Sequence, residues 1–420
     1  MKPHRDISFQ TKNKLRADHV IDTLFVVLIE VSPIMKFVIL LLIFALTGCS
    51  HTAKKVEPIT IPAPVSLMNH ALFKTVHVAQ EEHIFTLPEH EQLAFKAHVK
   101  QAQDKQVRAD RIIADYLESR ISNFSYDGAT LTASEVVAQN EGNCISLAIL
   151  TQAYADLIGV ETSFSEVASI PVYKQQNQTV LISHHFKTKL YAPLEEGSDW
   201  IYFMKPGTVI DYFPVKDIAF VGSASYQDLV AKYYANLATE ALLKEQFDLS
   251  YSLLVKAFLY APYDPELISL AAILHRRYGD TQTALALYEF AYKNQLLSSN
   301  LLHNYSFLAL QLGQTERVKE LDNALYSSAK TPFDFIQLAE QAIDRKKYIK
   351  AENILQELAQ NAPYLPEPFF SLAKVRYLQG DIKAAQQYLQ NALDKAEDQH
   401  KQGIYQAKLA TLKQFDSGYN

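Results

Sequence analysis

From about residue 226 to the end of the chain, apolar residues recur at helical spacing, and the whole pattern repeats at a fixed period. Small residues stand 34, 34, 33 and 34 positions apart, each where the two helices of a pair would cross, at Ser250, Ala284, Val318, Ala351 and Ala385. Turn signals such as Tyr278-Gly279-Asp280 and Gln379-Gly380-Asp381 separate the helical segments. The pattern predicts five helix pairs, beginning near residues 231, 265, 299, 332 and 366.

The period and the residue types of residues 226–420 resemble tetratricopeptide repeats. The resemblance implies an all-α solenoid that binds a protein or peptide partner. A further helix from Gln402 to Phe415 is expected to cover the open apolar face of the last repeat. The aromatic residues of the repeats are expected in the core rather than in contact with a ligand, namely Tyr305, Phe307, Tyr348 and Tyr377.

Residues 90–222 mix helical and alternating patterns. Apolar spacing predicts one helix from Glu91 to Ile121, and Thr132-x-x-Glu135 has the form of a capping box that starts a short second one. A third begins at Cys144 and ends near Gly159. Alternation then predicts three strands, at Thr162–Val167, Thr179–Tyr191 and Thr208–Phe213.

One cysteine, one histidine and one aspartate follow each other here in an order that suits nucleophilic catalysis. Cys144 stands at a helix start, where the dipole favours the thiolate. His185 follows 41 residues later and Asp211 follows 26 after that, both on predicted strands. They would serve as nucleophile, base and orienter. The neighbouring His184 is the alternative base, but it falls on the apolar face of its strand and is most simply a core residue.

At these residues the chain resembles the bacterial transglutaminase-like superfamily, which has the papain-like cysteine-hydrolase fold. The matching segments are Thr132-Ala133-Ser134-Glu135, Gly142-x-Cys144, Gly159-Val160-Glu161-Thr162, His185-Phe186 and Val209-Ile210-Asp211. The resemblance implies an α+β papain-like domain over residues 90–222. It also implies a side-chain amide near the thiol that helps to bind the oxyanion, for which the candidates are Gln139, Asn140 and Asn143.

The N-terminal residues resemble an export signal. Met35-Lys36 and the apolar run after it form a complete signal peptide, so Met35 is the expected start and residues 1–48 are expected to be removed. Leu46-Thr47-Gly48-Cys49 resembles a bacterial lipobox, which implies a lipid on Cys49; an uncleaved transmembrane anchor is the alternative. The lipoprotein resemblance also implies a location: an inner-membrane retention signal usually has Asp after the cysteine, and Ser50 stands there instead, so the outer membrane, facing the periplasm, is expected. Residues 49–89 are expected to be a lipid-anchored, proline-containing tether.

Charge and cysteine content narrow the functional classes. The formal net charge is −6 and no basic stripe offsets it, so we expect no nucleic-acid partner. The chain has two cysteines, and a lipid on Cys49 leaves Cys144 without a disulfide partner. His83, His90 and His98 lie near one another in the sequence, but no acidic or thiol residues accompany them at metal-ligand spacing. We therefore expect no metal site, and no cofactor.

Two functions remain. The first is a membrane-anchored periplasmic thiol hydrolase, a peptidase or amidase, that acts on a peptide or protein amide through Cys144, His185 and Asp211 while the repeats recruit substrate. Transfer of the acyl group to an amine, as in a transglutaminase, would use the same residues. The alternative is a non-catalytic lipoprotein scaffold whose repeats assemble a periplasmic complex.

Overall fold

The computed structural model describes residues 61–126, 128–168, 174–176, 179–181, 185–193, 205–212, 219–329, 331–396 and 399–417. A compact unit extends over Pro62–Asn420. The expected signal peptide, its start at Met35 and the lipidation candidate Cys49 lie outside the described residues. Within the described ranges, no helix has the length and apolarity that crossing a bilayer requires.

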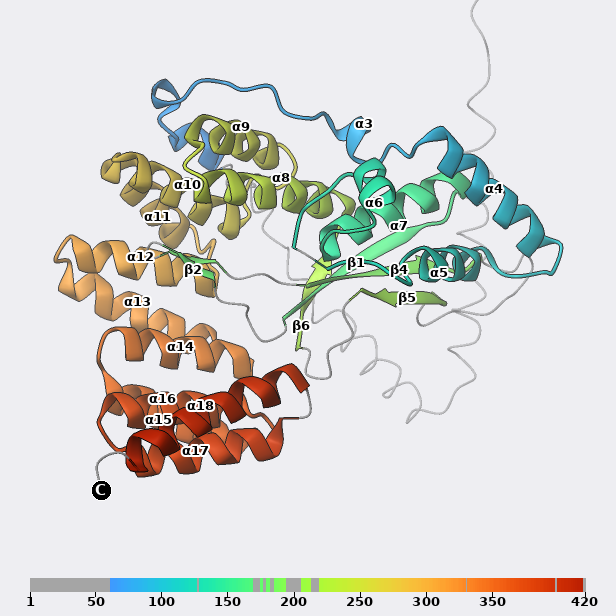
Figure 1. Cartoon of the computed structure of the whole chain (residues 1–420). Helices are drawn as coiled ribbons and strands as arrows, with labels where there is room; N and C mark the ends of the chain where they lie inside the picture. Colours follow the sequence, from blue (N-terminus) through green and yellow to red (C-terminus); the bar gives the residue numbers. More distant parts are fainter. Residues whose placement is uncertain are drawn as a thin grey trace, which may run out of the picture. The chain divides into compact units, whose positions relative to one another are not determined.

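Helices follow one another in pairs from residue 226 onward (Figure 1). The pairs are α8 (Tyr226–Leu243) with α9 (Phe247–Phe258), α10 (Pro265–Tyr278) with α11 (Thr281–Lys293), α12 (Ser299–Gln311) with α13 (Thr315–Ser328), α14 (Pro332–Asp344) with α15 (Tyr348–Asn361), and α16 (Glu367–Leu378) with α17 (Ile382–Lys395). The predicted pairs are confirmed. Only the first starts earlier than expected, because Ser225 and Asp228 form a capping box there.

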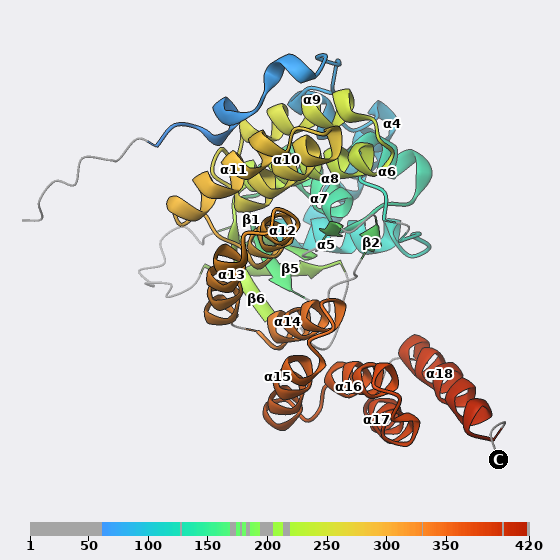
Figure 2. The same cartoon turned by 90° about the vertical axis from the view of Figure 1, so that its left-hand side faces the viewer.

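The predicted crossing residues are inside the repeats. Ser250, Ala284, Ala351 and Ala385 are fully buried, and Val318 is nearly so. After the last pair, α18 (Gln399–Ser417) packs against α17 (Figure 2). Its Tyr405 stacks on Phe370 of α16. This helix covers the end of the repeats, as predicted.

The four repeat aromatics differ in burial, and Phe307 and Tyr348 are partly exposed. Tyr305 is fully buried and stacks on Tyr288, with 5.3 Å between ring centroids, as expected of a core residue. Tyr377, in contrast, is 48% exposed, so the expectation that it belongs to the core is wrong. The period alone did not distinguish these two positions.

Residues before the repeats form helices and an antiparallel sheet. The helices are α4 (Glu89–Gln103), α5 (Ala109–Arg120), α6 (Ala133–Gln139) and α7 (Cys144–Ile158). The sheet consists of β1 (Thr162–Ala168), β4 (His185–Tyr191), β5 (Gly207–Asp211) and β6 (Ala219–Ala224) in the order β5-β4-β1-β6, and β2 (Lys174–Gln176) pairs separately with β3 (Thr179–Leu181). The mixture of helix and antiparallel sheet agrees with the predicted α+β class, although β2 and β6 were not predicted.

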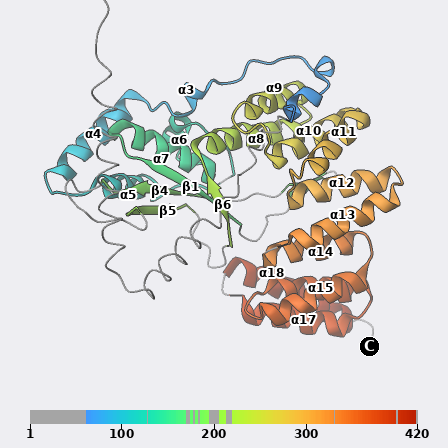
Figure 3. The ribbon, with the colours of Figure 1, turned by 180° about the vertical axis from the view of Figure 1, so that it is seen from behind.

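Helix α7 lies along one face of this sheet (Figure 3). Phe186, Thr188 and Leu190 of β4 are buried, whereas the lysines between them are partly exposed, so the predicted alternation is confirmed for these positions. The hydroxyl of buried Tyr212 lies 2.8 Å from Thr151 Oγ1 of α7 and 2.6 Å from Thr188 Oγ1 of β4. These contacts fix α7 against the sheet.

A buried carboxylate joins α7 to α4 and α5. Glu91 of α4 is 2% exposed. Its Oε1 accepts hydrogen bonds from the hydroxyls of Tyr116 and Tyr154, at 3.0 and 2.7 Å, and its Oε2 accepts one from Arg120 at 2.9 Å. Because every partner donates to the charged form, the carboxylate is stabilised without water. It connects α4, α5 and α7.

The helix predicted from Glu91 to Ile121 is two helices. Helix α4 ends at Gln103, and Gln106 adopts a left-handed conformation with φ of 59° before α5 begins. After the break, the buried carboxylate of Asp110 accepts hydrogen bonds from Arg108 and, at 2.7 Å, from Thr208 of β5. Apolar spacing did not reveal the break, because the pairing of Asp110 with β5 is a tertiary contact.

Residues 61–89, expected to be part of an extended tether, include two short 3-10 helices, η1 (Pro64–Leu67) and η2 (His70–Leu72), and the one-turn helix α3 (Glu81–Ile84). The segment from Asn69 to Val76 lies on the first two helix pairs. Phe73 is buried and stacks on Tyr251 of α9, with 5.0 Å between ring centroids. Burial of this aromatic side chain explains why the segment docks instead of remaining free.

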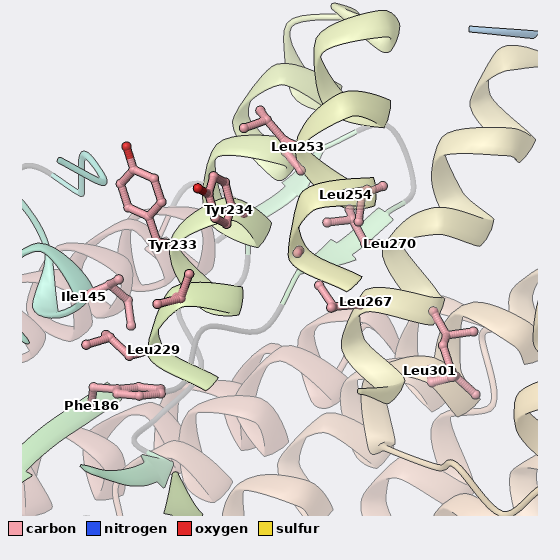
Figure 4. Packing of buried hydrophobic residues seen from close by; sticks show 14 of the residues in the cluster. Ile145, Phe186, Leu229, Tyr233, Tyr234, Leu253, Leu254, Leu267, Leu270 and Leu301 are labelled. Atoms are coloured by element: carbon pink, nitrogen blue, oxygen red, sulfur yellow. The ribbon is translucent and has the colours of Figure 1, made fainter. Parts of the chain in front are cut away.

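A single apolar core continues from the sheet into the repeats. Figure 4 shows Ile145 of α7 and Phe186 of β4 beside Leu229 of α8, and the same cluster extends to Leu301 of α12. Helix α8 therefore contributes both to the packing of α7 and to the first repeat.

Buried His275 of α10 binds the docked segment Asn69–Val76 through the backbone of Asn69. Its titration provides a test of this docking. Its Nδ1 lies 2.8 Å from the carbonyl oxygen of Ala271, and its Nε2 accepts the backbone N–H of Asn69 at 3.1 Å. Both contacts require a neutral ring with its proton on Nδ1. Burial lowers the pKa of His275, the Ala271 carbonyl and Asp280 oppose this effect, and nearby His70 adds to it.

We expect the free energy of unfolding to decrease as the pH falls below about 6.5, because the unfolded His275 then binds a proton that the buried ring resists. The free energy of unfolding should keep decreasing until the pH reaches the lower pKa of folded His275. The total decrease should be about 1.4 kcal/mol for each unit by which folding lowers that pKa. Thermal unfolding of the wild type and His275→Gln from pH 7.5 to 5 measures it. The variant keeps an acceptor for Asn69 but does not titrate, so its pH dependence should be shallower; equal slopes would contradict the account.

Candidate functional site

The candidate nucleophile Cys144 is the first residue of α7 and is half-buried. Asn143 caps the helix: its Oδ1 accepts the backbone N–H of Ser146 at 3.0 Å. Before it, Gly142 has a φ of +145°, and an added Cβ would lie 2.8 Å from the Cβ of Ser146. Only glycine suits this conformation and this close approach. The Gly142-x-Cys144 pattern thus has a local structural cause.

The loop before the thiol is held by its own hydrogen bonds. The side-chain amide of Asn143 donates to the Gly128 carbonyl at 3.2 Å and to Thr130 Oγ1 at 2.7 Å. Ser146 Oγ donates to the Ala129 carbonyl at 3.0 Å and accepts the Leu131 backbone N–H at 2.8 Å. These contacts fix the start of α7.

The three oxyanion candidates differ in the hydrogen bonds of their side-chain amides. Both amide hydrogens of Asn143 are taken by Gly128 and Thr130. Asn140 ends α6 in a left-handed conformation, and its amide donates to the Asn123 carbonyl at 2.9 Å. Gln139 is exposed at the end of α6. Which of them, if any, faces a substrate stays a prediction.

The pKa of the Cys144 thiol is raised rather than lowered. Burial is the largest cause, and the carboxylate of Glu166 on β1 adds to it. Backbone N–H groups, that of Phe186 first, oppose it by interacting with the sulfur. This direction is opposite to the one expected of a thiol at a helix start, because desolvation of the charge outweighs the dipole.

Asp211, the candidate orienter, ends β5 directly opposite Lys187 of β4. The Lys187 ammonium lies 2.6 Å from Asp211 Oδ2. Sequence reasoning did not predict this ion pair, although Lys187 falls on the polar face of its strand. The negative charges of Asp211 and Cys144 both raise the pKa of Tyr126, after the larger effect of burial. Tyr126 therefore lies near both residues, and it too was missed.

The backbone of His185 begins β4, pairs with Val167 of β1 and precedes Phe186, whose N–H reaches the Cys144 sulfur. The side chain of His185 and all of His184 lie outside the described part of the chain. The described residues thus bring Cys144, Asp211 and the His185 backbone to one region. The roles of the three side chains as a triad remain a prediction.

A second group of polar residues lies between α12 and α14. Ser299 and His303 of α12 face Asp334, Gln337 and Gln341 of α14 across a narrow crevice, which Leu325 and Leu338 complete. Gln337 is 6% exposed and Gln341 7% exposed. Within the described residues, Gln337 Nε2, Gln341 Nε2 and His303 Nδ1 are buried without a hydrogen-bond partner. Buried polar atoms without a partner are uncommon in native structures.

Some buried polar groups of the neighbouring helices are paired: Asn300 of α12 donates to Glu266 of α10 at 2.7 Å, and Ser371 of α16 donates to Glu340 of α14 at 2.7 Å. Within the described residues, single unpaired buried atoms also occur there, at Arg277, Tyr288, Tyr305, Glu367 and Arg376. The crevice between α12 and α14 brings three such atoms together. Its His303 is kept neutral at physiological pH, since burial, assisted by Arg345, lowers its pKa to about 4.

Across the described ranges, no three His, Cys, Asp or Glu side chains gather as potential metal ligands. The three histidines near the start of the chain are separate: His98, for example, lies against the Tyr116 ring, with 5.0 Å between centroids. The candidate chemistry therefore concerns the residues around Cys144 and the polar crevice.

Comparisons with known proteins concern the repeats. A family model described as the second ARM domain of tetratricopeptide repeat protein 21 matches residues 308–414. Solved structures similar to this chain include pilF of Pseudomonas aeruginosa (16% identity, 45% of this chain and 87% of that chain, TM-score 0.32) and yeast Tom70 (15% identity, 44% and 40%, TM-score 0.34). Another is PilW, a type IV pilus biogenesis factor (16% identity, 44% and 86%, TM-score 0.32). No curated protein matches the chain.

The helix pairs of this chain therefore identify it as a helical-repeat protein. The family model agrees over residues 308–414, from α12 to α18. That match does not extend to residues 90–222. The resemblance of this region to the transglutaminase-like superfamily stays a prediction.

The raised pKa of Cys144 predicts slow alkylation. In a Cys49→Ser chain, where Cys144 is the remaining thiol, we expect iodoacetamide to react at pH 7 at least about tenfold more slowly than in the denatured chain, because the thiolate is the reacting form. The rate should rise with pH beyond 9. Mass spectrometry of the labelled protein against time measures it. Fast labelling below pH 7 that His185→Ala abolishes would contradict the prediction and indicate an activated nucleophile.

Proposed function

We propose that this protein is a scaffold whose repeats bind an extended segment of a partner protein along α12 and α14. The observation that carries the proposal is a set of buried polar atoms without partners, the amide donors Gln337 Nε2 and Gln341 Nε2 and the ring nitrogen His303 Nδ1. Leaving such a group unpaired costs about 1–3 kcal/mol. The crevice has no room for a water molecule as it stands, so binding requires α12 and α14 to move apart. A bound chain that then supplied carbonyl oxygens would remove this cost.

The spacing of the two glutamines suits a peptide backbone. Gln337 and Gln341 are four residues apart on α14, a separation of about 6 Å along the helix axis. Carbonyl groups that point to the same side of an extended chain recur every two residues, at about 6.6 Å. Two successive carbonyls of an extended segment could therefore accept from the two amides. Both glutamines would bind backbone carbonyls, which every peptide has. Contacts of the partner's side chains with other residues of the repeats would therefore determine which partner binds.

Replacing either amide by an isosteric apolar group tests the proposal. We expect Gln337→Leu and Gln341→Leu each to raise the free energy of unfolding by about 1 kcal/mol, since each removes an unpaired buried donor. The same variants should bind peptides at least about tenfold more weakly, because one hydrogen bond and its donor are lost. Urea unfolding measures the first effect. Fluorescence anisotropy, with peptides selected by the wild-type chain from a phage-displayed library, measures the second.

The exposed Gln360 of α15 provides the control, and Gln360→Leu should change neither quantity by more than a small amount. A lower free energy of unfolding in both Gln337→Leu and Gln341→Leu would mean that the two amides already have hydrogen-bond partners. Unchanged peptide binding in those variants would place the binding surface elsewhere. Either result would refute the proposed role of the crevice.

A thiol hydrolase that uses Cys144, His185 and Asp211 is the second candidate. Two observations favour it. The Cys144 sulfur lies beside the N–H of Phe186, the residue after His185. Cys144 and Asp211 both lie near Tyr126. A peptidase, an amidase and an acyl transferase would share the attacking thiolate and the proton transfer by histidine. The labelling experiment above distinguishes this candidate from an inert buried thiol.

We also propose that the protein acts at a bacterial membrane, held by a lipid on Cys49 and facing the periplasm. Support comes from Leu46-Thr47-Gly48-Cys49 at the end of an apolar run, and Ser50 favours the outer membrane. The mature chain would then begin at Cys49 with acyl groups. Mass spectrometry of the membrane-extracted protein tests this, and an unmodified Cys49 would refute it.

A further inference from the structure

A groove opens on a different part of the repeats from the polar crevice. It encloses about 790 Å³, within the range of roughly 300–1,000 Å³ that is typical of ligand-binding clefts. Its walls come from α13, from the turn between α14 and α15, from the first turns of α15 and from the residue after α16. The lining residues used below are Tyr326, Lys346, Lys347, Ile349, Lys350 and Glu357.

The groove exposes apolar side chains that the repeat core does not need. Ile349 of α15 is 75% exposed, although Ala351 and Leu355 of the same helix are fully buried. Tyr326 of α13, on another wall, is 46% exposed. Binding is favoured when a partner covers such a side chain, because apolar surface is removed from water. A pair that faces one groove can hold an aromatic or aliphatic side chain between its members.

The charge of the groove is positive, in a chain whose formal net charge is −6. Three lysines and one glutamate line it, which leaves a local excess of two positive charges. Lys347 lies 3.8 Å from Asp322, but Arg345 already binds both oxygens of that carboxylate, at 2.8 and 3.0 Å. Lys346 and Lys350 are exposed and have no ion pair within the described ranges. Their charges are available to a ligand.

From this combination we infer that the groove docks an acidic segment of a partner protein. One aromatic or aliphatic side chain of the segment would lie between Tyr326 and Ile349, and flanking carboxylates would pair with Lys346 and Lys350. A second copy of this chain fits less well, because a two-fold contact through the groove would bring the lysines of both copies together. The inference goes beyond the proposed function, since it adds a second surface formed by other helices.

The test uses the full chain and a defined probe, the fluorescein-labelled peptide Glu-Glu-Phe-Glu-Glu-Leu-Glu. Fluorescence anisotropy should show saturable binding that weakens as salt increases. The double substitution Lys346→Glu, Lys350→Glu should weaken binding at least about tenfold, since two charge-assisted contacts become repulsive. Ile349→Ser should weaken it several-fold. All three residues are exposed, so circular dichroism should show an unchanged fold.

Matched controls separate this surface from the rest of the chain. Lys293→Glu changes an exposed lysine of α11 by the same charge and should leave binding unchanged. Gln337→Leu distinguishes the two surfaces: binding of this peptide that depends on Gln337 but not on Lys346 and Lys350 would place the peptide in the polar crevice and refute the groove. A peptide with serine in place of phenylalanine and leucine should bind more weakly.

Three results would overturn the inference. The first is equal peptide binding by the wild type and the double lysine variant. The second is equal binding of the serine-substituted peptide, which would mean that the apolar walls have no role. The third is no peptide binding together with lysine-dependent binding to vesicles of phosphatidylglycerol and phosphatidylcholine, which would make the groove a membrane contact.

Discussion

The repeats depend on a small side chain at each helix crossing. Ser250, Ala284, Ala351 and Ala385 have no exposed surface, so a larger side chain there would have to displace the facing helix. Close crossings fix the rotation of each helix, because side chains three and four positions apart share one face. That rotation brings Gln337 and Gln341 into the crevice between α12 and α14 and leaves Ile349 of α15 in the basic groove. Both proposed surfaces therefore follow from the same packing constraint.

The helices and sheet that precede the repeats are joined to them by charge as well as by the apolar core. Lys232 of α8 lies 3.2 Å from Glu166 of β1 and 4.0 Å from Asp264, which caps α10. The attraction of these carboxylates outweighs desolvation and raises the pKa of Lys232. Glu166 also opposes ionisation of Cys144. The residue that anchors the sheet to the repeats thus contributes to the high pKa of the candidate nucleophile.

The sequence predicted what depends on neighbours along the chain. The repeat period placed four of the five helix-pair starts within one residue, the Thr132 capping box is present, and alternation correctly separated Phe186 from Lys187. It failed where distant segments meet. The docking of Phe73 on α9, the ion pair of Lys187 with Asp211 and the high pKa of Cys144 all arise from tertiary contacts that no local pattern contains.

The claim that α12 and α14 form a partner-binding surface has a direct test in cells. A photo-crosslinking amino acid at Ser299, which lines the crevice and is partly exposed, would be compared with one at Lys293, which is exposed on α11. The account predicts a discrete crosslinked partner at position 299, reduced when Gln341→Leu is added and absent at position 293. Equal crosslinking at both positions, or crosslinking at 299 that is indifferent to Gln341→Leu, would contradict it.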